Sequence, residues 1–130
     1  MNQTSESIQQ LMEYYFGNKN CIAVVLANED GLPIASRIPE DKTRTKELEY
    51  LLSAMSSTFI FTGLNAGTRL SLGDPLMLTL ELKEGIMLVR SMRDSVCCGV
   101  ILAQNGNIAY YNIKIKEFTE KVSKILFPDE

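Results

Sequence analysis

One apolar segment interrupted by an acidic turn constrains this chain more than any other feature. Residues 21–36 read CIAVVLANEDGLPIAS, so an unbroken apolar run precedes the turn sequence Asn-Glu-Asp-Gly at 28–31, and a second strand-like run follows. Asp-Gly between two such runs indicates a hairpin, because glycine adopts the positive φ that a tight turn needs. The first run shows no polar alternation, which predicts a strand buried on both faces. Pro33 cannot donate to a strand ladder and therefore predicts an edge strand or a bulge.

Apolar periodicity divides the rest of the chain into helices and strands. The predicted elements, in order, are a helix at 8–15, the two hairpin strands, a helix from Thr45 to Leu64, strands at 76–82, 86–92 and 96–103, and a helix at 108–125. Gly63 and Gly67 bracket the predicted end of the middle helix. The run at 96–103 is apolar on both faces and is expected at the centre of the sheet.

The element order α-β-β-α-β-β-β-α predicts an α+β fold. Strands joined by tight turns are antiparallel neighbours, so the sheet is expected to be antiparallel. The 130 residues, 45% hydrophobic and 22% charged, have ordinary globular composition. We therefore expect a single domain over residues 1–130.

The middle helix has apolar side chains on two opposite sides, read at about 100° per residue. One set is Leu48, Leu51, Leu52, Met55 and Phe59, and the other is Tyr50, Ala54, Ser57, Phe61 and Leu64. One side must cover the sheet, and the other is covered either by another element of the chain or by a second copy about a two-fold axis. We favour the second copy, because the other two helices are expected on the far face. Ala54 and Ser57 are small enough to let two helices approach closely.

The composition argues against most catalytic and metal chemistry. The chain has no histidine, which excludes Cys-His and Ser-His nucleophile systems and removes the commonest general base. Its cysteines form no C-x-x-C pair, so a structural zinc site is not expected. We predict no catalytic residues, no metal and no cofactor, and we expect that the chain is not an enzyme.

Charge and hydropathy limit the partners and the location. The net charge is -3, so no basic excess exists to neutralise nucleic-acid phosphates. The lysines of the last helix interleave with Glu117 and Glu120, which is typical of a solvated face rather than an anion-binding patch. The chain begins without a signal-peptide pattern, and no apolar run is long enough to span a bilayer. We expect a soluble cytoplasmic protein with no membrane insertion.

The three cysteines, Cys21, Cys97 and Cys98, are expected to be small buried hydrophobes in a reducing compartment. Adjacent strand residues point to opposite faces, so Cys97 and Cys98 cannot easily share a metal or form an ordinary disulfide. The alternative is a vicinal redox pair, which needs an exposed thiol of low pKa.

The hairpin and the element order together resemble the roadblock family, of the dynein light-chain roadblock type. The resemblance is most specific where 24–26 leads into Asp30-Gly31, followed by the apolar-Pro-apolar sequence at 32–34. It covers the whole chain in element order, although the first and last helices depart from the pattern. It implies a profilin-like sandwich in which a five-stranded antiparallel sheet carries one long helix on one face and two helices on the other.

The resemblance also implies a function, because roadblock proteins are small dimeric scaffolds for Ras-like GTPases. Two copies pair through the long helix and through the strand after it. The implied dimer interface is Tyr50, Ala54, Ser57, Phe61, Leu64, Leu76, Leu78 and Leu80. In bacterial relatives the GTPase meets the surface of the paired long helices, and the matching exposed residues are Lys46, Glu49, Ser53 and Ser56. A heterodimer with another roadblock chain is left open.

The alternative function is that of a small-molecule or redox sensor, because profilin-like folds also hold ligand pockets. Its cavity would be lined by Cys97, Cys98, Met77, Met87 and Met92. Methionines on strands are more often core filler, which favours the scaffold.

Overall fold

The computed structural model describes residues 3–39 and 45–128, and its elements follow the predicted order. The elements are α1 (Gln3–Phe16), β1 (Cys21–Ala27), β2 (Pro33–Arg37), α2 (Thr45–Arg69), β3 (Met77–Leu82), β4 (Gly85–Ser91), the 3-10 turn η1 (Arg93–Ser95), β5 (Cys97–Ala103) and α3 (Ile108–Leu126). The α+β prediction is confirmed.

The five strands form one antiparallel sheet in the order β2-β1-β5-β4-β3. The two runs without polar alternation, β1 and β5, lie side by side at the centre, and nearly all their residues are buried. β2 is an edge strand, and its register with β1 shifts between Leu26 and Ala27, opposite Pro33. The proline therefore marks both the edge and the irregularity that it predicted.

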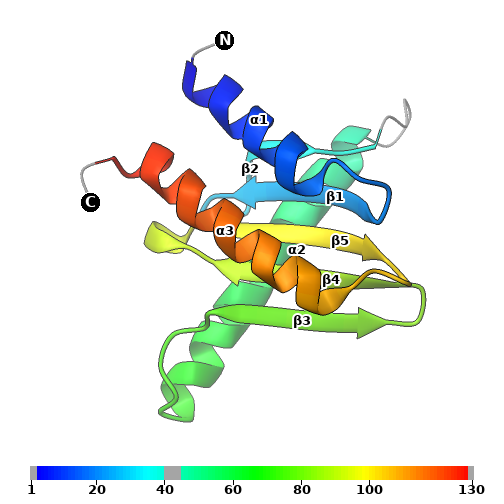
Figure 1. Cartoon of the computed structure of the whole chain (residues 1–130). Coiled ribbons are helices and arrows are strands. Elements are labelled where there is room, and N and C mark those ends of the chain that lie inside the picture. The colour runs from blue at the N-terminus through cyan, green and yellow to red at the C-terminus, as the bar shows by residue number, and fades with distance from the viewer. Residues whose placement is uncertain (1–2, 40–44, 129–130) are drawn as a thin grey trace.

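Helices cover both faces of the sheet (Figure 1). α1 and α3 lie together on one face, over a core cluster that includes Phe16, Leu88 and Phe118. α2 crosses the other face diagonally, over a smaller cluster that includes Val25, Leu52 and Val89. One long helix on one face and two on the other is the predicted sandwich.

The β1–β2 turn depends on Asn28 and Gly31. The Asn28 side-chain oxygen accepts hydrogen bonds from the backbone N–H groups of Asp30 and Leu32, at 2.9 and 3.1 Å. Gly31 has φ +77°, a conformation that L side chains rarely adopt. It also packs against α2, because a Cβ at Gly31 would lie 3.3 Å from the Cα of Ala54. The glycine thus closes the turn and allows it to touch the long helix.

α2 faces the sheet with Leu52 and Phe59 of its predicted apolar side and with two serines that were not expected there. Its buried residues are Leu52, Ser53, Ser56 and Gly67. Leu51 and Met55, expected on the sheet, are exposed instead, so this part of the prediction is wrong. The cause is Gly99 of β5, where a Cβ would lie 1.9 Å from the Oγ of Ser56. Two small residues meet there, so helix and sheet approach too closely for a leucine.

α2 also continues past the end expected for it, Leu64, to Arg69. Gly63 and Gly67 do not end the helix. They let the following loop cross it, because a Cβ at Gly67 would lie 1.8 Å from the backbone oxygen of Gly73. The helix ends where the N–H of Leu72 donates to the Gly67 oxygen at 2.8 Å.

We expect Gly99→Ala to lower the free energy of unfolding by about 1–3 kcal/mol, because the added methyl overpacks the contact with Ser56. Ser56→Ala is the matched control. The Ser56 hydroxyl is buried with no hydrogen-bond partner among the described residues, so its removal should leave stability unchanged or raise it. Urea unfolding at one fixed protein concentration measures both variants. Wild-type stability in Gly99→Ala would show that the contact does not set the helix position.

Candidate functional site

Exposed apolar side chains gather on α2, on the turn after it and on β3. They are Tyr50, Leu51, Met55, Phe61, Leu64, Leu70, Leu72, Leu76, Leu80 and Leu82. Phe61 is 65% exposed and Leu64 41%, so the described part of the chain leaves both exposed. Exposed apolar side chains that gather on neighbouring elements mark a candidate binding surface. This surface is the candidate functional site.

The small residues of the predicted interface already have a use within the chain. Ala54 and Ser57 lie against the β1–β2 turn, because a Cβ at Gly31 would come within 3.3 Å of the Ala54 Cα and 3.6 Å of the Ser57 Cβ. Their small size therefore lets the hairpin approach α2, and it need not reflect a second helix. Tyr50, Phe61 and Leu64 remain exposed, whereas Leu78 of β3 is half-buried.

The four residues predicted to contact a partner have different environments. Lys46 is exposed, and Glu49 is half-buried and accepts a hydrogen bond from the Ser36 hydroxyl. Ser53 and Ser56 are fully buried on the side of α2 that faces the sheet, so the prediction that they meet a partner is wrong. The reason is the close approach of α2 to Gly99. The sequence did contain a signal for this burial: two serines lie three residues apart in a helix, and a glycine lies in a central strand.

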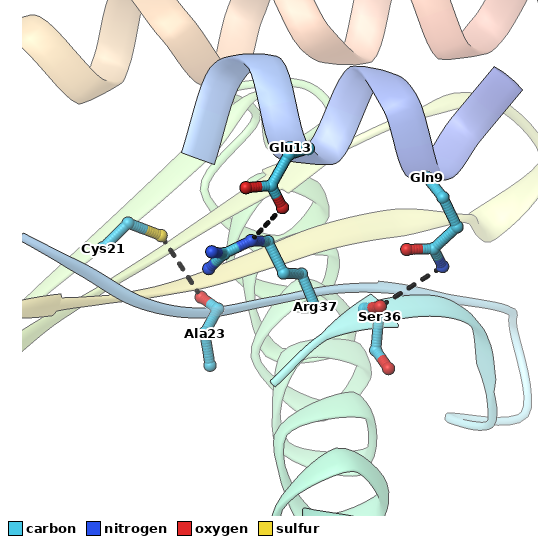
Figure 2. A network of polar contacts seen from close by, with 6 residues as sticks. All are labelled: Gln9, Glu13, Cys21, Ala23, Ser36 and Arg37. Carbon is cyan, nitrogen blue, oxygen red and sulfur yellow. Dashed lines mark hydrogen bonds and ion pairs between the residues drawn. The ribbon is translucent and has the colours of Figure 1, made fainter. Parts of the chain in front are cut away.

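The two edges of the sheet differ in how open they are to pairing. The β2 edge is tied to α1: the Gln9 amide donates to the Ser36 carbonyl at 3.3 Å, and the Arg37 Nε lies 2.8 Å from a Glu13 carboxylate oxygen. Figure 2 shows both contacts reaching down from the helix to the strand. The hydrogen bond and charge of Arg37 lower the pKa of Glu13. Pro33, a charge pair and a covering helix are common means of protecting a sheet edge.

β3, at the other edge, carries none of these protections in the part of the chain that the structure describes. Its sequence, MLTLEL, contains no proline and no lysine, and Glu81 is its one charge. Thr79 to Leu82 are exposed. A long apolar edge strand is a template for pairing with another chain. β3 is therefore the edge at which a further strand can add to the sheet.

An open apolar groove of about 660 Å³ lies between the first half of α2 and the β3–β4 turn. Its lining is Leu48, Leu51, Leu52, Met55, Leu82, Lys83, Glu84, Gly85, Ile86, Met87 and Ile101. Sequence reasoning missed this groove, because it placed Leu51 and Met55 on the sheet. The rotation of α2 onto its small residues turns both side chains toward the groove.

The five residues proposed for a sensor cavity do not come together. Cys97 belongs to the cluster under α2, and Cys98 to the cluster under α1 and α3. Met77 and Met92 pack against that second cluster, whereas Met87 shares the first cluster with Cys97 and also lines the groove. The cysteines are buried, as predicted, and burial raises the pKa of the Cys97 thiol from 9.0 to about 11. None of the three thiols has the low pKa that a redox pair needs.

The described residues contain neither a metal-ligand cluster nor a membrane-spanning helix. Within residues 3–39 and 45–128, no three Cys, Asp or Glu side chains gather closely enough to hold a metal ion. In the same part of the chain, no helix has the length and hydropathy to cross a membrane.

Comparison with known proteins identifies the fold. No protein-family model matches the sequence, and no curated protein matches it either. Solved structures do match. A Roadblock/LC7 domain from Streptomyces avermitilis is 20% identical, with 90% of this chain and 95% of that chain covered and a TM-score of 0.79. Myxococcus xanthus MglB is 14% identical, with 92% and 94% covered and a TM-score of 0.79.

A third match is the gliding protein MglB from Thermus thermophilus, which is 9% identical, with 96% of this chain and 92% of that chain covered and a TM-score of 0.81. The chain is thus an α+β sandwich with helices on both faces of a five-stranded antiparallel sheet. Its fold is the roadblock (Roadblock/LC7) fold, as the hairpin and element order indicated.

The buried thiols make a prediction about reactivity and pH. At pH 8 the native protein should react with Ellman's reagent at least about a hundredfold more slowly than the urea-unfolded chain, because Cys21 and Cys97 are buried with pKa values near 11. The unfolded thiols ionise first, near pH 9, so the free energy of unfolding should fall as the pH rises from about 9 toward 11. One rapidly reacting native thiol would restore the redox-sensor hypothesis.

Proposed function

We propose that this chain is a non-catalytic, cytoplasmic, homodimeric scaffold that binds a Ras-like small GTPase and modulates its nucleotide state or localisation. The observation that carries the proposal is the exposed apolar surface of α2 and β3 on a roadblock fold. A chain with this much uncovered apolar surface gains stability when a second copy covers it. The resemblance to roadblock proteins supports the GTPase as partner.

The contrast between the two sheet edges supports self-association through β3. An edge tied down by α1 cannot accept a strand easily, whereas β3 offers free backbone positions and exposed leucines. Two antiparallel β3 strands would join the sheets across a two-fold axis and would bring Leu76, Leu78 and Leu80 to the interface. One solved MglB with the same fold has a tetrameric arrangement.

The mechanism that we propose for GTPase regulation is structural. A rigid paired surface that contacts the switch regions in one of their two states shifts the population toward that state. In the dimer, the outward sides of the two α2 helices form one continuous surface. We propose that Lys46, which is exposed on α2, contacts the GTPase, whereas Ser53 and Ser56 are buried and cannot take part.

A second function is favoured by one observation, the apolar groove. Ligand sites commonly have volumes of roughly 300–1,000 Å³ and mostly apolar linings, and the groove of about 660 Å³ meets both conditions. The alternative is a sensor for an apolar small molecule bound between α2 and the β3–β4 turn. The groove is open on one side, so a ligand there would stay partly in contact with water or with a second protein.

Leu80→Glu should make the protein monomeric, because it places a charge on the open edge strand. Ile34→Glu is the matched control: Ile34 is 40% exposed on the β2 edge and Leu80 39% exposed on the β3 edge. Light scattering after size exclusion should give twice the chain mass of 14.6 kDa for the wild type and for Ile34→Glu, and a single chain mass for Leu80→Glu. A wild-type mass of one chain at micromolar concentration would contradict the dimer.

Binding to a GTPase should depend on its nucleotide. We expect the affinity for a purified Ras-like GTPase from the source genome to differ at least about tenfold between its GDP and GTP-analogue forms. Lys46→Glu should weaken this binding severalfold, whereas Lys116→Glu, an exposed change on α3, should not. Biolayer interferometry with the immobilised chain measures all of these affinities. Equal affinity for both nucleotide forms, or none for any such GTPase, would contradict the proposed regulation.

A further inference from the structure

The groove and an exposed end of α2 lie at opposite ends of the same edge strand. The groove includes Leu82 and the turn that follows β3. The other end carries what we call the overhang, residues 65–72, which comprises the last turn of α2 and the chain that leaves it. Figure 1 shows α2 running past β3 at the end where that strand begins. Within the overhang Gly67 is buried, against the returning loop at Gly73, and the other residues are exposed.

We infer that the overhang of one copy occupies the groove of a second copy, and that the two copies exchange this contact reciprocally. The inference rests on the proposed homodimer. A two-fold axis perpendicular to the sheet, beside the middle of β3 on its open edge, pairs the two β3 strands antiparallel. The same rotation exchanges the two ends of the strand. It therefore brings the overhang of each copy to the groove end of the other, on the face of the sheet that carries α2.

The surfaces that meet in this arrangement match in chemistry. The groove is lined by leucine, isoleucine and methionine side chains, and the overhang presents Leu70 and Leu72, both strongly exposed. Charges lie at the margins of each. Lys83 and Glu84 line the groove at the β3–β4 turn. Arg69 lies in the overhang and Asp74 follows it. Each copy therefore offers both signs of charge to its partner, as a self-complementary interface requires.

In this arrangement the dimer interface contains the groove side of α2 and not the side that carries Tyr50. Leu48, Leu51 and Met55 lie on the groove side, toward β3 and the second copy. Ala54 and Ser57 lie against the β1–β2 turn, and Ser57 is about 120° from Leu51 around the helix. Tyr50 falls close to Ala54 around the helix, because four residues span about one turn. The groove side is therefore buried in the dimer, and the Tyr50 side stays exposed.

Cysteine cross-linking separates these two sides of α2. The test uses the full chain with Leu51→Cys and Leu72→Cys together. Residues 51 and 69 are about 27 Å apart along one helix at about 1.5 Å per residue, so a short bis-maleimide cannot join the two cysteines within a copy. The control is Tyr50→Cys with Leu72→Cys, because Tyr50 is 50% exposed and Leu51 48%. The native cysteines are buried and do not compete.

We expect the Leu51→Cys pair to give at least tenfold more covalent dimer on a denaturing gel than the Tyr50→Cys pair. Leu48→Cys with Leu72→Cys is the second pair, should Leu51→Cys not fold, and the same excess is expected. Equal or absent cross-linking in a protein that light scattering shows to be dimeric would overturn the inference and leave the homodimer standing. A single chain mass would overturn both.

Discussion

The contact between Ser56 of α2 and Gly99 of β5 determines which side chains of α2 face the sheet and which face outward. Two small residues let the helix lie unusually close to the central strand, and that closeness fixes the rotation of the helix about its axis. Leu51 and Met55 then turn to one side and Tyr50 and Phe61 away from the sheet, where the chain itself leaves them exposed. The apolar surface is thus a consequence of how the core is packed.

The two edges of the sheet differ in how easily another strand can pair with them. α1 ties the β2 edge through Gln9 and Glu13, and the β1–β2 turn rests on α2 at Gly31. Among residues 3–39 and 45–128 no helix covers the β3 edge in this way, and α2 extends past it to Arg69. A fold that protects one edge and exposes the other directs association to a single place. In our proposal, this is how a small scaffold presents one defined paired surface to a GTPase.

Much of the fold could be predicted because local sequence determines it. Asn28 and Gly31 specify the hairpin through their own side chain and backbone, and the runs without alternation marked β1 and β5 as central. The rotation of α2 could not be predicted, because apolar residues occur nearly all round that helix. Which side meets the sheet depends on Gly99, which lies more than forty residues away in sequence. The same limit explains the errors at Ser53 and Ser56, and the reading of Gly63 and Gly67 as a helix end.

The most direct test of the account is hydrogen exchange of the β3 backbone amides in the wild-type protein. A free edge strand leaves every second amide without a partner, and those amides exchange within seconds, as in a loop. If a second copy completes the sheet, consecutive amides from Met77 to Leu82 should all be protected, at a level approaching that of β4. Fast exchange of alternate β3 amides at every protein concentration would contradict the claim that this chain completes itself with a second copy.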